Sequence, residues 1–337
     1  MLTQGDIDAL FQPMAGARHL LIAVSGGPDS LALMVLMARW RAARGSGPAL
    51  SVAHVDHSLR TASHLEGAVV AGAAAKCGMD CMMLRWEGVK PVTRIQERAR
   101  DARYRLLVEG ARRIGADGLV TAHHAGDQAE TVLQRLAHGS GIAGLAGIAP
   151  WRRHEELVLW RPLLDVSKAT LAEVCRAAGL EAFDDPSNHN PAFERARLRH
   201  FASERAQLGL TDATLTRLAR RAARAEAALA AATTAFLTTM NVSEGYVGAA
   251  APWGALPDEI MMRALGLVMA GLNKDAQVPL AKLERLASRL QAALACDENL
   301  GATLVGCSVR MQAARAGRPA MLSIQRAPPR RAVRPLT

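Results

Sequence analysis

Aromatic residues are scarce in this sequence, at 4% of 337 residues, although half of the chain is hydrophobic. The core must therefore be built mainly from Ala, Leu, Val and Met. The five cysteines form no CxxC pair, so the sequence supports neither a zinc site nor a thiol redox motif, and a reducing compartment fits. Acids near the start argue against a secretory signal, and no window reaches about 18 uncharged apolar residues. We therefore expect a cytoplasmic protein without a membrane partner.

Acidic residues are also too few to balance the basic ones, with 31 Asp and Glu against 41 Lys and Arg and a net charge of +10. A surplus of this size favours an anionic partner such as RNA, DNA or a membrane surface. The alternative is a codon bias toward Ala and Arg with no partner at all. The length allows two domains or one large one.

Short apolar runs alternate with helical stretches through the first two hundred residues. The expected strands are 19–24, 50–55, 81–86, 119–122 and 157–160. The expected helices are 30–44, 61–77, 93–114 and 127–138, with a further helix after Asp165. This alternation predicts an α/β fold with a doubly wound parallel sheet. Ligands of such sheets bind at the carboxyl ends of the strands, so the turns after the first, second and fourth strands are the candidate sites.

The composition changes near Thr211, where an Ala-rich helical stretch with regularly spaced arginines runs to Met240. We predict a catalytic domain over 1–204, followed over 205–325 by a linker helix and a smaller, mainly helical C-terminal domain. Residues from 253 onward could form either an α/β or a helical module. The basic, Pro-rich end at 326–337 is typical of a disordered tail.

The turn after the first expected strand reads SGGPDS, and it lacks the lysine of the common phosphate-binding loop GxxxxGK[ST]. Its glycines allow a tight turn that brings backbone N–H groups to phosphate oxygens. The N-terminus of the following helix adds its positive dipole end. Asp29 stands where a metal ion bridging phosphates would need a carboxylate. The alternative is an ordinary strand–helix turn with a Ser or Asp cap.

Two further turns carry polar side chains. The segment HVDHSLR at 54–60 has two histidines and an acid but no further ligands at fitting spacing, so a helix cap or a contact with an adenosine edge fits better than a metal site. The segment AHHAGDQAET places Asp127 and Glu130 on one face of a helix, a spacing that suits a capping box as well as catalysis. The adjacent His123 and His124 at a strand end favour a functional site.

Together these turns resemble the PP-loop ATP pyrophosphatase superfamily, whose signature SGGxDS is matched by SGGPDS. Within it, the chain resembles the tRNA(Ile)-lysidine synthetase family over about residues 18–200, in the ordered segments 54–60, 98–104, 121–131, 139–148, 161–164 and 184–199. The resemblance implies ATP-dependent ligation of L-lysine to C2 of the wobble cytidine of a CAU anticodon. The partner would be isoleucine tRNA, the intermediate an adenylated cytidine, the products lysidine, AMP and pyrophosphate, and the metal Mg²⁺.

The same resemblance implies the site residues. ATP would be bound by Ser25, Gly26, Gly27, Pro28, Asp29, Ser30 and Arg100, with Asp29 also near Mg²⁺. Lysine and the reacting cytosine would be held by His123, Asp127 and Glu130. The tRNA would be bound by Arg195 and Arg199. The catalytic set would be Asp29, His123, Asp127, Glu130 and Arg199. Alternatively, Arg195 and Arg199 could have no role beyond an ion pair with Asp184 or Asp185.

Some features depart from the family pattern or leave alternatives. Phe193 and Ala196 stand where the family usually has Tyr and Asn, and the oligomeric state, monomer or homodimer, stays open. Another PP-loop amidation or thiolation is the competing enzymatic reading, although sulfur-inserting relatives carry CxxC pairs or cluster cysteines. An RNA adaptor without chemistry is the competing reading of another class, and the presence of Asp29, Asp127 and Glu130 argues against it.

Overall fold

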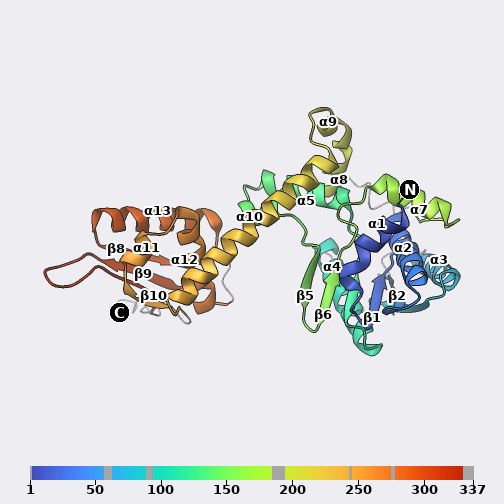
Figure 1. Ribbon diagram of the computed structural model, residues 1–337, viewed down its shortest axis with the longest axis horizontal. Helices are drawn as coiled ribbons and strands as arrows, with labels where there is room; N and C mark the ends of the chain where they lie inside the picture. Colours follow the sequence, from blue (N-terminus) through green and yellow to red (C-terminus); the bar gives the residue numbers. More distant parts are fainter. Residues whose placement is uncertain are drawn as a thin grey trace, which may run out of the picture. The chain divides into compact units, whose positions relative to one another are not determined.

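The structure is a computed structural model that describes residues 2–56, 63–88, 93, 95–183, 194–242, 245–274 and 278–328. The chain divides into two compact units (Figure 1). Residues 1–139 and 144–221 form the first unit, and residues 140–143 and 222–337 form the second. None of the described helices is both long and apolar enough to cross a membrane.

A six-stranded sheet in the order β3-β2-β1-β4-β6-β5 forms the centre of the first unit. All its neighbouring strands are parallel except β5, which is antiparallel to β6. The strands are β1 His19–Ala23, β2 Ala49–Asp56, β3 Asp80–Arg85, β4 Gly118–Val120, β5 Trp151–His154 and β6 Leu157–Trp160. Because the strand order reverses at β1 and β4, a crevice is expected at the carboxyl ends of these two strands.

Helices cover both faces of this sheet. They are α1 Gln4–Phe11, α2 Pro28–Arg44, α3 Ser63–Lys76, α4 Ile95–Arg113, α5 Ala125–Ala137, α7 Lys168–Ala177, α8 Glu194–His200 and α9 Ala202–Gln207, and the short α6 Ile142–Leu145 follows α5. Strand β1 shows why both faces are covered: Leu20 and Ile22 pack into a core with α1, α2, α3 and α7, whereas Leu21 points to the opposite core with α4. The predicted doubly wound α/β fold class is confirmed.

The second unit is an antiparallel sheet with helices on one face. The strands β7 Tyr246–Ala249, β10 Met321–Arg326, β9 Cys307–Gln312 and β8 Leu300–Leu304 lie in that order, together with α11 Ala251–Gly254, α12 Asp258–Leu272 and α13 Leu280–Cys296. Helix α10, Asp212–Thr239, begins in the first unit and ends in the second. Trp253 is fully buried here, with the rings of Phe236 and Tyr246 at 5.2 and 5.3 Å. The expected domain here was mainly helical, and this four-stranded sheet was not predicted.

Candidate active site

The SGGPDS turn joins β1 to α2 and leaves the helix N-terminus open. Gly27 is the N-cap residue, and no side chain caps the helix, so the alternative of a Ser or Asp cap does not hold. Gly26 has a φ of 92°, a conformation that favours glycine. The Ser30 hydroxyl donates to Gly27 O at 2.9 Å and accepts the Ser25 N–H at 3.1 Å. The loop is therefore braced from inside while its N–H groups stay available to an anion.

Asp29, in the first turn of α2, presents two oxygens with different surroundings. Its Oδ2 lies 3.5 Å from Nε2 of His124. Its Oδ1 is buried and has no hydrogen-bond partner in the described part of the chain. A buried carboxylate oxygen without a donor suits a cation, so Asp29 fits the single carboxylate ligand of an Mg²⁺ ion that takes its other ligands from phosphates and water. No group of three His, Cys, Asp or Glu side chains able to hold a metal is found among the described residues.

The turn after β4 forms a capping box, but not the one that the sequence spacing indicates. His124 is the N-cap of α5, and its Nδ1 accepts the Gly126 N–H at 3.0 Å. Asp127 closes the box, because its Oδ2 accepts the His124 backbone N–H at 3.0 Å. The box therefore spans His124 and Asp127 and leaves Glu130 for another contact.

Glu130 is held by an arginine that is distant in sequence. Nε and Nη2 of Arg199, on α8, donate to the two carboxylate oxygens of Glu130 at 2.6 and 3.1 Å. Nη2 of Arg199 also lies 3.7 Å from Oδ1 of Asp127. Asp29, His124, Asp127, Arg199 and Glu130 thus form one connected chain of ionisable side chains, which we call the charge chain. The side chain of Arg195, together with Asp184 and Asp185, lies outside the described residues.

The contacts within the charge chain shift the pKa values of Asp127, Arg199 and His124. Burial raises the pKa of Asp127, but the charge of His124 and the backbone hydrogen bond outweigh it and lower the pKa overall. Burial lowers the pKa of Arg199, and the Glu130 hydrogen bond and charge reverse the direction. Burial likewise lowers the pKa of His124, and the contact with Asp29 and the charge of Asp127 raise it overall. The Asp127 carboxylate and the Arg199 guanidinium are therefore held in their charged forms.

His123 lies beside this chain, and its pKa shifts in the direction that favours the uncharged form. Burial lowers the pKa of His123 to about 3, with Asp127 opposing this shift and Arg161 adding to it. Its Nδ1 lies 3.0 Å from the hydroxyl oxygen of Thr121. His123 is therefore a neutral imidazole at physiological pH.

Arg100 is placed apart from the charge chain. It is exposed on α4, with its guanidinium 5.2 Å from the ring centre of Tyr104. It lines a pocket of about 350 Å³ together with residues of α4 and β5, among them Arg152. Its charge still reaches His123, whose pKa it helps to lower.

Comparisons with known proteins show what the chain is similar to. The PP-loop domain profile matches residues 2–205. A tRNA(Ile)-lysidine synthase of a Bradyrhizobium strain is 45% identical over 87% of this chain and 85% of its own length. The enzyme of the same name from Rhodopseudomonas palustris is 43% identical over 96% of this chain and 94% of its own. The chain belongs to the tRNA(Ile)-lysidine synthase family. The resemblance inferred from the sequence is confirmed, and with it an ATP-binding PP-loop enzyme.

A solved structure extends the likeness at the level of fold. The U34-tRNA thiolase NcsA from Methanococcus maripaludis, solved with its [4Fe-4S] cluster, superposes with a TM-score of 0.53. It is 14% identical, over 64% of this chain and 77% of its own. At this identity the match shows the PP-loop fold alone.

The second candidate turn of this family member is only partly described. His54 is buried, and its Nδ1 lies 3.0 Å from Val24 O, at the end of β1. The imidazole therefore joins β2 to the residue that follows β1. Residues 57–60 of the same motif lie outside the described residues.

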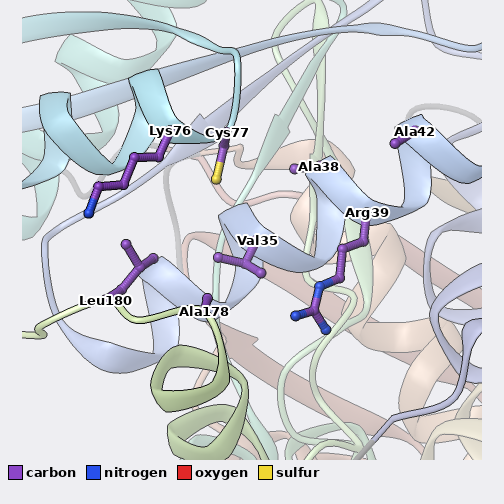
Figure 2. Close-up of a pocket in the computed structure, with 8 residues that line it drawn as sticks. All are labelled: Val35, Ala38, Arg39, Ala42, Lys76, Cys77, Ala178 and Leu180. Carbon is purple, nitrogen blue, oxygen red and sulfur yellow. The ribbon is translucent and has the colours of Figure 1, made fainter.

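A separate pocket of about 390 Å³ lies among α2, α3 and the segment after α7 (Figure 2). Its lining residues are Val35, Ala38, Arg39, Ala42, Lys76, Cys77, Ala178 and Leu180. In Figure 2, Cys77 points toward Val35, and the cationic ends of Arg39 and Lys76 lie at opposite sides. This pocket shares no residue with the charge chain, so it is not the candidate active site.

Proposed function

We propose that the protein ligates L-lysine to C2 of the wobble cytidine in the CAU anticodon of isoleucine tRNA, with ATP converted to AMP and pyrophosphate. The observation that carries the proposal is the charge chain, which joins the carboxyl ends of β1 and β4 beside the open N-terminus of α2. The names of the 40–45% identical relatives support the substrate and the reaction.

The first step would adenylate the cytidine. Its O2 attacks the α-phosphorus of ATP, the bond to the bridging oxygen breaks, and pyrophosphate leaves with that electron pair. The glycine turn and the helix dipole would hold the phosphates, and Asp29 would hold Mg²⁺, which supplies positive charge against the developing negative charge when bound. The SGGPDS turn would not need the lysine residue of the GxxxxGK[ST] loop. The leaving group is pyrophosphate, and the α-phosphorus must stay accessible.

The second step would replace AMP by lysine. The ε-amine attacks C2, the C–O bond to AMP breaks, and the amine loses a proton. A free ammonium has a pKa of about 10.4, so an acceptor must take its proton. Both oxygens of Glu130 accept hydrogen bonds from Arg199, whereas in the described part of the chain the contact of Asp127 Oδ1 is the longer one of 3.7 Å with Arg199 Nη2. We therefore assign proton acceptance to Asp127 and the orientation of Arg199 to Glu130.

The neutral ring of His123 would hydrogen-bond the lysine or the cytosine rather than carry charge. Its low pKa means that it adds no positive charge beside the cationic amino acid. Its position beside Asp127 supports this assignment.

Binding of the tRNA would rest on arginines. Arg195 and Arg199 belong to α8, and Arg217, Arg220 and Arg221 are exposed on α10. Of the last three, Arg220 lies 3.7 Å from Asp165, while the described residues offer Arg217 and Arg221 no ion pair. Exposed arginines of this kind bind phosphates in a salt-dependent way.

The test is nucleoside analysis of CAU-anticodon isoleucine tRNA after incubation with the protein, ATP, Mg²⁺ and lysine. We expect lysidine, with AMP and pyrophosphate released in equal amounts. Methionine tRNA, which shares the anticodon, is the control for discrimination. Ammonia or sulfide in place of lysine tests the other PP-loop reactions. Product formation only with one of those donors, or release of neither AMP nor pyrophosphate, would refute the proposal.

A further inference from the structure

His124 is less exposed to solvent than its neighbour His123, and its ring lies near two carboxylates of the site. Its side chain is 8% exposed, and its two ring nitrogens face different elements. Nδ1 faces the backbone of α5, where it accepts the Gly126 N–H at 3.0 Å. Nε2 faces the carboxylates of Asp29 at 3.5 Å and Asp127 at 3.7 Å.

The helix cap fixes which nitrogen carries the proton. A neutral imidazole has one donor and one acceptor nitrogen, and Nδ1 is occupied as the acceptor. The proton therefore sits on Nε2 and points toward the carboxylates. Asp127 Oδ2 already accepts the His124 backbone N–H at 3.0 Å, so Asp29 Oδ2 is the acceptor that gains most from this proton.

The choice of residue also points beyond capping. Asn, Asp and Ser are the preferred N-caps and would satisfy the Gly126 N–H at least as well as histidine. The side chains of Asn and Asp end at the position of Nδ1 and that of Ser ends one atom earlier, whereas the imidazole extends farther, to Asp29 on a different helix. Histidine at this position thus does what a smaller cap does and adds a donor that links α5 to α2.

Asp29 is the residue that this donor would hold. Its Oδ2 faces His124 while its Oδ1 is buried without a partner in the described part of the chain. A carboxylate fixed at one oxygen presents the other in a defined direction, which is how residues behind a metal ligand orient it.

We propose that His124 is a positioning residue whose Nε2–H holds Asp29 Oδ2 and so directs Asp29 Oδ1 at the cation of bound MgATP. The inference rests on the proposed function only in taking Asp29 as the carboxylate that meets this cation. It does not depend on which nucleoside or amine the enzyme joins.

Two substitutions separate capping from positioning. His124→Asn keeps an acceptor at the position of Nδ1 but loses the donor that faces Asp29. His124→Gln places an amide N–H₂ near the position of Nε2 instead. We expect H124N to weaken metal-dependent ATP binding roughly tenfold, as for other residues behind a metal ligand, and H124Q to restore most of it. ATP binding without a divalent cation should be unchanged in both.

The measurement is equilibrium dialysis of labelled ATP with and without Mg²⁺, together with the electron paramagnetic resonance signal of free Mn²⁺ in the presence of ATP. Thr3→Ala is the control for loss of a helix cap, because Thr3 caps α1, which carries none of the site residues. An H124N protein that binds MgATP like wild type would overturn the proposal. So would equal losses in H124N and H124Q, or a loss that T3A reproduces. Failure of the wild-type protein to form lysidine, with MgATP binding intact, would refute the proposed function and leave this inference standing.

Discussion

Each of the two units holds a bidentate arginine–glutamate pair, and the two pairs have different roles. In the first unit Arg199 binds Glu130 at 2.6 and 3.1 Å. In the second unit Arg263 binds Glu226 with two hydrogen bonds of 2.7 Å and Glu259 with a third of 2.7 Å. The first pair continues through Asp127 toward Asp29, whereas the second is complete within α10 and α12. The two pairs have the same chemistry. Their roles differ because the first is connected to the other carboxylates of the candidate site, whereas the second only joins two helices.

The two units that contain these pairs also differ in how many polar side chains they bury. The described residues with buried polar or charged side chains lie in the first unit, apart from Thr233. The core of the second unit is built from apolar side chains such as Trp253 and Leu265. Burial of polar groups costs free energy unless they are paired, so a sequence that concentrates them in one place usually does so for function. The comparison therefore predicts that equal changes in the two units will have unequal effects.

The largest effect is expected at the far end of the charge chain. Asp29→Asn keeps the shape of the side chain but removes the charge that would meet Mg²⁺. We expect AMP release to fall on the order of 10³-fold, measured at saturating tRNA and lysine. Affinity for tRNA, measured by filter binding, should not change. Loss of tRNA binding instead would assign the loop a structural role and weaken the contrast between the units.

The next effect comes from Glu130→Gln, which breaks the pair of the first unit. The amide can accept only one of the two Arg199 hydrogen bonds, so the guanidinium loses its fixed orientation beside Asp127. We expect turnover to fall on the order of 10²-fold. The free energy of unfolding should also fall, by about 3 kcal/mol, because the change removes the charge of the buried partner in an ion pair. Full activity in this variant would show that the Arg199–Glu130 pair is only structural, like the Arg263–Glu226 pair of the second unit.

Some of this arrangement could be predicted from the sequence, because it depends on local signals. Helix α2 ends at Arg44, and Gly45 is its C-cap residue, with a φ of 67° that the glycine at this position predicts. Apolar runs with glycine turns were enough to predict the parallel sheet and the open N-terminus of α2. The motifs also drew attention to Asp127 and Glu130.

Other parts depend on contacts that no local pattern reveals. Arg199 and Glu130 are 69 residues apart in sequence, so their pairing appears only in the folded chain. A histidine N-cap is uncommon, and the sequence therefore gave no reason to prefer His124 over His123 for the contact with Asp29. Strand β5, Trp151–His154, was missed because three of its four residues are polar and it lies at the sheet edge, where alternation is weak.

A smaller effect, and one on stability alone, is expected from the matched substitution Glu226→Gln in the second unit. It removes one of the hydrogen bonds between α10 and α12, and Arg263 keeps Glu259 as a partner. We expect the free energy of unfolding to fall by about 2 kcal/mol, the usual scale for a hydrogen bond to a charged group. Urea denaturation measures this change, and lysidine formation under native conditions should equal that of wild type. Reduced turnover in E226Q with unchanged stability would remove the distinction between the two pairs.

The smallest expected effect is a difference between the two units in how their stability depends on pH. In the unfolded chain the imidazole of His123 takes up a proton near pH 6.5, whereas burial lowers the pKa in the folded state to about 3. The unfolded state therefore binds more protons between these values, and the first unit loses stability as the pH falls below 6.5, by at most about 1.4 kcal/mol per pH unit. His123→Asn keeps an acceptor for Thr121 and should remove this share of the slope in urea denaturation between pH 7 and pH 5.5. An unchanged slope would show that His123 is protonated when folded. All ten histidines lie between residues 19 and 200, so the second unit has none and should show no such loss over the same range.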